Sequence, residues 1–291
     1  MMTRTIPLLF YYIVTLTTGY PLSAQQNTQA PVTFTKVSDR IYGIEGGRGA
    51  QTGVVIGDDC VLVVDAKMDK KSQDDIFLEI GRLTKKPIKY LVNTHGDADH
   101  ISGNRYFPAT VTIIAHDGCR KDFFVTGSDG KPSEWTKPEL APFVPVVTFL
   151  DRMNIYLGGL TVELHHFGIA HTIGDAVVYI PAEETIFTGD QVSLPKATYI
   201  HAYKGGNTFG HVRNLERMMT TIKAERFITG HSGITDRAGV QRAIDAMKNF
   251  QNNIRTFITK KKSIADIKKE FPSKDSSLVE IVYKEITEGR E

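Results

Sequence analysis

Short apolar runs rich in β-branched residues fill the first part of the chain and predict strands. The Gly-Asp-Asp turn at residues 57–59 joins the last two of these runs as a hairpin. Residues 70–83 then place apolar side chains at the spacing of a helix, and IKYLVNT at 88–94 returns to the strand pattern. The four early runs are VTFTKV, IYGIEG, TGVVIG and CVLVVDA.

The alternation of strand and helix patterns continues beyond these residues. A short helix from about residue 99, a strand VTIIA and a helix over 117–124 close the first half. Residues 127–142 are rich in glycine, proline and charge and predict a long loop between the halves. The second half begins with five further strand patterns: PVVTFL, MNIYL, LTVELHHF, DAVVYIP and ETIFTGD.

The last part of the chain is mainly helical. A loop over 191–207, a helix over 210–224 and a strand RFITGH precede residues 237–290, which are mostly helical with a break at Pro272. Strands followed by helices, twice over, predict an α/β protein with two sheets packed face to face and helices outside. No segment repeats at a period of roughly 20–50 residues, which excludes a solenoid.

The N-terminus has the pattern of a secretory signal peptide. One positive charge precedes the apolar run IPLLFYYIVTLT, and GYPLSA ends in a plausible cleavage site at Ala24. The apolar run is shorter than the ~20 residues of a membrane-spanning helix. We therefore expect a signal peptide over 1–24, a flexible leader over 25–31 and one domain over 32–291. No cysteine stands directly after the cut, which argues against a lipoprotein anchor. We therefore expect a periplasmic or secreted protein without a stable membrane anchor.

Composition narrows the class of partner. The chain has 41% hydrophobic and 23% charged residues, typical of a soluble protein, and its formal charge of +2 does not indicate nucleic-acid binding. We expect a small-molecule substrate, and the sequence does not indicate an oligomeric state. Cys60 and Cys119 could pair in an oxidising compartment, but both lie at the edges of apolar runs, and we expect buried free thiols.

The stretch NTHGDADHISGN holds His95, Asp97, Asp99 and His100 within six positions. Positions 95, 97 and 99 project to one side of an extended segment, and position 100 projects to the other. Such a segment can offer two groups of ligands to two neighbouring metal ions, since imidazole and carboxylate are normal zinc ligands. A hydrated acidic turn is the alternative interpretation.

Three more candidate ligands follow at the ends of predicted strands or beside them. His171 lies in GIAHTIGD before a strand, Asp190 ends TIFTGD, and His231 ends RFITGH. Each alone is typical of an ordinary structural residue. Together, at the rims of strands, they favour a shared metal site.

These motifs resemble those of the metallo-β-lactamase superfamily. THGDADHISGN, AHTIGD, FTGD and TGHS occur in the family's order, and the resemblance covers roughly residues 32–245. It implies an αβ/βα four-layer sandwich with a metal site at one edge, and Asp65 as a buttress of the metal loops. Transferred residue by residue, it implies these ligands: His95, Asp97 and His171 for the first metal ion, Asp99, His100 and His231 for the second, and Asp190 bridging both.

Asp97 departs from the family pattern, in which most members carry histidine. Two divalent ions and three aspartates give the site a net charge of +1, whereas a histidine at position 97 would give +2. We therefore expect the less positive site to lower the pKa of metal-bound water less. The carboxylate also shifts preference from zinc towards manganese or iron. An acid here resembles the flavodiiron branch, but this chain lacks room for a flavodoxin domain, so an iron redox protein is a minor alternative.

The predicted site suits metal-assisted hydrolysis by two metal ions, most simply zinc. Asp99 would bind the second metal ion and orient or accept a proton as the catalytic residue. The leading hypothesis is hydrolysis of a β-lactam, lactone, ester or thioester. No cysteine lies near Asp190, which disfavours the β-lactamase branches with a cysteine ligand. A non-catalytic metal-binding protein is a further alternative, weakened because every ligand position holds a competent ligand.

Substrate contacts are expected from the loop over 194–213. Lys204, Asn207 and His211 are candidates to bind a carboxylate or oxyanion of the substrate. A solvated connector is the alternative interpretation of this loop. The sequence assigns no role to His201.

Overall fold

The structure is a computed structural model that describes residues 30–127 and 130–291. The predicted signal peptide over 1–24 lies outside the described residues, as does the predicted leader up to residue 29. Within the described ranges, no helix is long and apolar enough to cross a membrane.

The first sheet has seven strands that follow one another in sequence order. Its first four strands pair antiparallel, and the fourth to seventh pair parallel. The strands are β1 (Thr33–Lys36), β2 (Ile41–Glu45), β3 (Thr52–Ile56), β4 (Val61–Val64), β5 (Ile88–Asn93), β6 (Thr112–His116) and β7 (Val147–Phe149).

The second sheet has six strands in the order β13-β12-β11-β10-β9-β8. All neighbours pair antiparallel except β11 and β12, which are parallel. The strands are β8 (Arg152–Tyr156), β9 (Thr161–His165), β10 (Val177–Ile180), β11 (Thr185–Gly189), β12 (Arg226–Thr229) and β13 (Ile234–Thr235).

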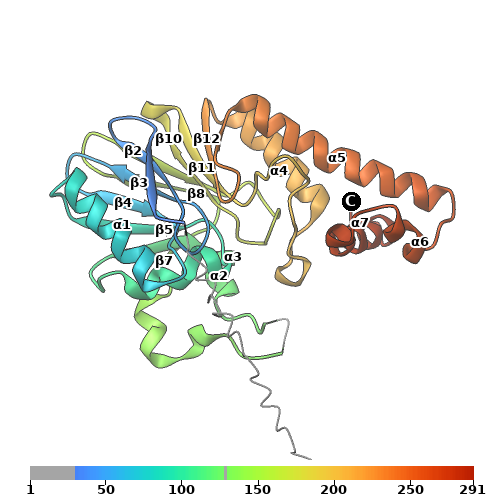
Figure 1. The fold of residues 1–291 in the computed structure, drawn as a ribbon, viewed down its shortest axis with the longest axis horizontal. Helices are drawn as coiled ribbons and strands as arrows, with labels where there is room; N and C mark the ends of the chain where they lie inside the picture. Colours follow the sequence, from blue (N-terminus) through green and yellow to red (C-terminus); the bar gives the residue numbers. More distant parts are fainter. Residues whose placement is uncertain (1–29, 128–129) are drawn as a thin grey trace, which may run out of the picture.

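Seven α-helices accompany the sheets in the described part of the chain, together with short 3-10 turns. The helices are α1 (Lys70–Leu83), α2 (Ala98–Ile101), α3 (Asp117–Asp122), α4 (Thr208–Thr221), α5 (Arg237–Thr259), α6 (Ile264–Lys269) and α7 (Ser276–Thr287). Figure 1 shows α1 on one side of the two sheets and α4 with α5 on the other.

The core lies between the two sheets because alternate strand residues point to opposite faces. Leu62 and Val64 of β4 pack against Val178 and Ile180 of β10 in one buried cluster. Their neighbours point outward instead: Val61 and Val63 pack beneath α1, and Val177 and Tyr179 pack beneath α4 and α5. This arrangement confirms the predicted αβ/βα four-layer sandwich.

The described part of the predicted long loop over 127–142, from residue 130 on, differs from expectation. It contains the short 3-10 helix η2 (Glu134–Thr136) and most of a second, η3 (Pro138–Phe143). Trp135 is buried against Phe123 of the segment that follows α3, with ring centroids 5.0 Å apart. Burial of large aromatic surface therefore fixes η2, although the composition of its surroundings alone indicates a loop.

The C-terminal helices form a layer of their own. α5 continues well past the sheets, and α6 and α7 lie beside its far end (Figure 1). The buried Glu285 of α7 accepts hydrogen bonds from the backbone N–H and the hydroxyl of Thr208 at the first turn of α4. The C-terminal helices are thereby joined to the segment that follows the loop over 191–207.

Both cysteines of the chain are buried free thiols. Burial raises the pKa of the Cys119 thiol well above its ordinary value and also raises that of Cys60. The two side chains therefore fit the sequence expectation of unpaired core residues.

Candidate metal centre

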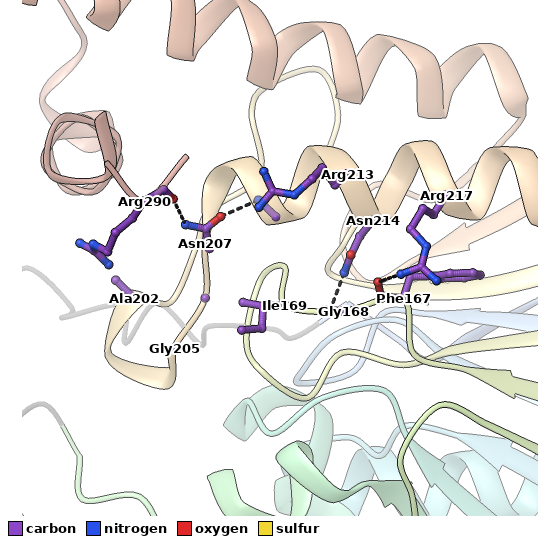
Figure 2. A pocket seen from close by; sticks show the side chains of 12 residues that line it. Phe167, Gly168, Ile169, Ala202, Gly205, Asn207, Arg213, Asn214, Arg217 and Arg290 are labelled. Atoms are coloured by element: carbon purple, nitrogen blue, oxygen red, sulfur yellow. Dashed lines mark hydrogen bonds between the residues drawn. The ribbon is translucent and has the colours of Figure 1, made fainter. Parts of the chain in front are cut away.

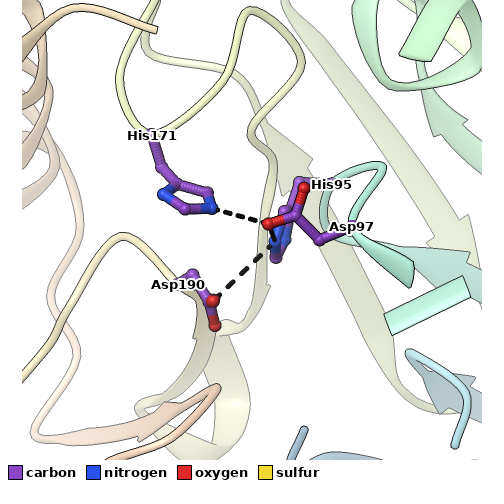
Figure 3. A group of neighbouring side chains, drawn as sticks. All are labelled: His95, Asp97, His171 and Asp190. Carbon is purple, nitrogen blue, oxygen red and sulfur yellow. Dashed lines mark hydrogen bonds and ion pairs between the residues drawn. The ribbon is translucent and has the colours of Figure 1, made fainter. Parts of the chain in front are cut away.

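Seven histidine and aspartate side chains converge in two adjoining groups at one edge of the sandwich. The ligand atoms of each group lie within 4.8 Å of one another. Figure 3 shows the first group, in which His171 and Asp190 face His95 and Asp97 from the opposite sheet. The two groups are His95, Asp97, His171 and Asp190, and Asp99, His100 and His231. The structure thus brings together all seven residues that the sequence predicts as metal ligands.

The ends of strands position these residues. β5 ends at Asn93, two residues before His95, and the next residues turn into α2 with Asp97 as its N-cap residue. The sequence predicts an extended segment up to Asp99 and a short helix from about residue 99, and the structure begins the helical turn one residue earlier, at Ala98. Side chains of successive helical residues point about 100° apart. Asp99 and His100 therefore still point in other directions than Asp97, and they belong to the second group.

Two glycines allow the loops around Asp190 to approach closely. Gly189 has a φ of +54°, which turns the chain sharply at the end of β11. A Cβ atom on Gly230 would lie 1.9 Å from Asp190 Oδ1, so only glycine fits beside this carboxylate. The glycines of FTGD and TGHS therefore allow the loops that carry Asp190 and His231 to come close together.

Asp190 lies between the two groups. Its Oδ1 is 3.1 Å from His100 Nε2, and its Oδ2 is 3.2 Å from His231 Nε2 and 3.9 Å from His95 Nε2. Among the described residues of the cluster it faces histidines of both groups, which is the position of a bridging ligand.

Asp65 supports the cluster from below, as the resemblance implies. It accepts hydrogen bonds from the backbone N–H and the hydroxyl of Thr94, both at 2.7 Å, and it lies 2.8 Å from His100 Nδ1. His171 Nδ1 likewise donates to the carbonyl of Tyr199 at 2.6 Å. A proton held on Nδ1 leaves the lone pair of Nε2 directed into the cluster, as a metal ligand requires.

The donor atoms fit divalent metal ions. The buried atoms His95 Nε2, His100 Nε2 and Asp190 Oδ1 have no hydrogen-bond partner in the described part of the chain. Buried polar atoms are rarely left unpaired, and an ion would satisfy all three. The ligand atoms of a tetrahedral zinc ion lie roughly 3.3 Å from one another. The distances of 3.1 and 3.2 Å from the Asp190 oxygens to His100 Nε2 and His231 Nε2 are close to this value.

The aspartates of the cluster stabilise positive charge on their neighbours. Burial opposes the charged form of Asp190, but His100, His231 and His95 together hold its pKa well below the ordinary value. Hydrogen bonds to Asp190 and Asp99 raise the pKa of His231 to about 9. Carboxylates that draw protons onto imidazoles in this way also attract metal ions, which replace those protons.

Asp97 has two neighbours that the sequence did not place beside it. Lys204 Nζ donates to Asp97 Oδ1 at 2.6 Å and to the carbonyl of Gly96 at 2.8 Å. His201 Nε2 lies 2.8 Å from Asp97 Oδ2. The sequence did not indicate a role for His201, because only the course of the loop over 191–207 brings it to the cluster. The aromatic and basic residues near it in that loop were the one local sign that the loop belongs to a site.

The other predicted substrate contacts lie apart from this cluster. Asn207 caps α4 by accepting from Gly210 N–H at 2.5 Å and donates to the carbonyl of Arg290 at 3.1 Å (Figure 2). His211 is fully buried, donates from Nε2 to the carbonyl of Gln191 at 2.7 Å, and has a pKa lowered by burial to about 4. Neither side chain lines the cavity beside the metal ligands.

That cavity has a volume of about 660 Å³ and opens beside Asp97 and Asp99. Its walls include Trp135 from η2 and Tyr203 from the loop over 191–207. The volume is that of a small-molecule site, with aromatic walls and a few polar groups.

The family follows from a direct match. The family model described as "Metallo-beta-lactamase superfamily" matches residues 46–231. The chain belongs to this superfamily. The match spans the ligand motifs from His95 to His231, so this metallo-β-lactamase superfamily protein carries its metal-site residues within the matched region.

Solved metallo-β-lactamases share the fold. A metallo-β-lactamase from Pontibacter korlensis is 18% identical with a TM-score of 0.63, covering 75% of this chain and 99% of its own. The DIM-1 metallo-β-lactamase is 17% identical with a TM-score of 0.60, covering 76% and 99%. One from Erythrobacter litoralis is 16% identical with a TM-score of 0.56, covering 75% and 96%. A comparison with curated proteins gave no match.

Asp122 of α3 lies beneath the metal loop and gives a pH prediction. Both of its carboxyl oxygens are buried without a hydrogen-bond partner among the described residues, and burial raises its pKa to about 7 from 3.8. Between these two pH values the folded chain holds a proton that the unfolded chain has released. The contribution of Asp122 to the free energy of unfolding therefore falls as the pH rises from about 4 to about 7.

Replacing Asp122 by asparagine is expected to raise the free energy of unfolding by about 2 kcal/mol above pH 7, with little change near pH 4. Urea unfolding of the chelator-treated protein at both pH values measures this. Asp151→Asn, at an exposed position, is the control and should change neither value. An equal effect of Asp122→Asn at both pH values would show that its ionisation does not destabilise the fold.

Proposed function

We propose that the protein is a metal-dependent hydrolase with two divalent metal ions, most simply zinc, that acts on a small ester, lactone, thioester or β-lactam. The observation that carries the proposal is the pair of ligand groups joined at Asp190, beside a cavity of about 660 Å³. The expected signal peptide further supports a periplasmic or secreted location.

The metal ions would supply Lewis acidity and a water of lowered pKa. His95, Asp97 and His171 would hold one ion, Asp99, His100 and His231 the other, and Asp190 both. That set combines imidazole nitrogen with carboxylate oxygen, which suits zinc, manganese and iron.

Asp99 is the residue best placed to move a proton. It lines the cavity, its side chain is 31% exposed, and its Oδ2 lies 3.1 Å from His231 Nε2. Although burial opposes ionisation, the hydrogen bond from His231 holds the pKa of Asp99 below its ordinary value. Asp99 is therefore ionised at neutral pH and can accept a proton from the attacking water and return it to the leaving group.

The contacts of Lys204 bear on the choice of substrate. An ammonium group that already donates to Asp97 and to the carbonyl of Gly96 is less free to bind a substrate carboxylate. Trp135 and Tyr203 offer apolar surface in the same cavity. We expect uncharged lactones and esters to be hydrolysed at least as fast as carboxylate-bearing β-lactams.

A substrate panel tests the proposal. The metal-loaded protein is assayed with nitrocefin, lactones, aryl esters and thioesters, each with and without prior removal of metal by a chelator. We expect turnover of at least one class, its loss with the chelator and its return with added zinc or manganese. Metal-loaded protein that hydrolyses none of them, or turnover unchanged by the chelator, would contradict the proposal.

A further inference from the structure

Three imidazole nitrogens surround one oxygen of Asp97. His201 Nε2 lies 2.8 Å from Asp97 Oδ2, His171 Nε2 lies 3.0 Å from it, and His95 Nε2 lies 3.3 Å from it. Hydrogen bonds from His201 and His171 can use the two lone pairs of this oxygen. They leave unexplained His95 Nε2, a buried atom without a hydrogen-bond partner among the described residues. The three distances from Oδ2 are also close to the roughly 3.3 Å between ligand atoms of one zinc ion, which would engage His95 Nε2 as well.

The backbone fixes the ring of His201 at this place. Its N–H donates to the carbonyl of His171 at 2.9 Å, which joins the loop over 191–207 to a ligand-bearing loop. The ring makes edge contacts with His171, Tyr199 and Tyr203, with centroids 4.7, 4.9 and 5.2 Å apart. His201 is thus held against the first ligand group on three sides.

Lys204 completes the arrangement through the other oxygen of Asp97. Its Nζ lies 2.6 Å from Oδ1, and the two side chains are only 9% and 11% exposed. The ammonium offsets the carboxylate charge and leaves Oδ2 to face the imidazoles. The net charge is then the one that a histidine at position 97 would leave, so the less positive site expected from the sequence does not follow.

We propose that His201 is a ligand of the first metal ion and, with His95 and His171, restores the three-imidazole set that Asp97 interrupts. Lys204 is a positioning residue that holds Asp97 by Oδ1. The inference rests on the metal dependence in the proposed function but needs no turnover. Asp97, His201 and Lys204 together then supply what a single histidine supplies at position 97: an imidazole donor without added negative charge.

Zinc binding by His201→Ala tests the proposal. Competition with a chromophoric chelator measures the dissociation constants, and we expect that of the first ligand group to rise at least about tenfold. His165→Ala is the control, because His165 pairs with Glu163 on β9, away from the cluster. Thermal unfolding of the metal-free variants shows whether each one folds. A folded His201→Ala variant that binds zinc as the wild-type chain does would overturn the proposal.

The cobalt-loaded protein gives a readout independent of affinity. Ligating imidazoles give exchangeable N–H proton resonances with large paramagnetic shifts. We expect five ligating imidazoles in the wild-type and His165→Ala proteins, from His201 and the four histidines of the two groups, and four in His201→Ala. A His201→Ala spectrum that retains every shifted resonance of the wild-type spectrum would refute the ligand role.

A triple variant tests whether the three residues replace one histidine. Asp97→His, His201→Ala and Lys204→Met together are expected to return the zinc dissociation constant to within about threefold of wild type, less than 1 kcal/mol. Affinity as weak as in His201→Ala alone would contradict this equivalence. Protein that retains the five shifted imidazoles but hydrolyses nothing would refute the proposed function and leave His201 as a ligand.

Discussion

Replacing Asp190 by alanine is expected to lower the hydrolysis rate by at least about a thousandfold, which is about 4 kcal/mol of transition-state stabilisation. The reason is its position: its two oxygens face His100, His231 and His95 from both ligand groups. The variant should also bind fewer than two metal ions per chain. Turnover of the best substrate and the metal content of the same preparation measure both effects.

The control for this variant is Asp151→Ala, an exposed aspartate on the turn between β7 and β8. It should retain wild-type turnover and metal content. Circular dichroism of the metal-free Asp190→Ala protein distinguishes a lost ligand from a lost fold. A folded Asp190→Ala variant with two bound metal ions and wild-type turnover would remove Asp190 from the site.

Replacing Lys204 by methionine is expected to destabilise the metal-free protein by about 3 kcal/mol, because a buried carboxylate loses its ammonium partner. Burial alone would lower the pKa of Lys204, and Asp97 raises it above its ordinary value, so the pair is charged at neutral pH. Bound metal should remove most of the deficit, since the ion compensates the charge of Asp97 in the folded state. Urea unfolding with chelator and with zinc measures both values.

Two further variants isolate the ion pair. Asp97→Asn combined with Lys204→Met leaves no uncompensated charge, and we expect close to wild-type stability without metal. Lys70→Met breaks an exposed pair with Asp74 and should change stability by less than about 1 kcal/mol. If metal-free Lys204→Met were as stable as wild type, the Asp97–Lys204 pair would contribute nothing to the fold.

Periodicity was sufficient to predict most of the fold. α1 has the predicted bounds because the apolar spacing over 70–83 buries Ile76 and Ile80 on one face. The runs that became β4 and β10 are apolar on both faces, as a strand between a sheet and a helix layer must be. β13 escaped prediction, since two residues carry no periodic signal. Trp135 shows how an aromatic anchor can order a segment of loop composition.

The metal site was predictable where short motifs end strands. His95, Asp190 and His231 each follow a strand by one or two residues, so the topology of the sheets decides where they lie. Lys204 and His201 belong to a loop whose course depends on hydrogen bonds to the loop of His171, which no local pattern encodes.

Local rules could have indicated the structural roles of two other residues. Asn207 has an N-cap side chain immediately before α4. His211 lies four residues before the buried Leu215, on the core face of that helix. Both positions thus carried a structural signal in addition to their chemistry.

The central claim is that two bound metal ions make this protein a hydrolase. Its most direct test is a titration of metal-free protein with zinc, in which bound zinc and the hydrolysis rate of the best panel substrate are measured at each addition. We predict that the rate rises with bound zinc and levels off at two ions per chain. A rate of zero at full occupancy, or saturation of binding below one ion per chain, would contradict the account.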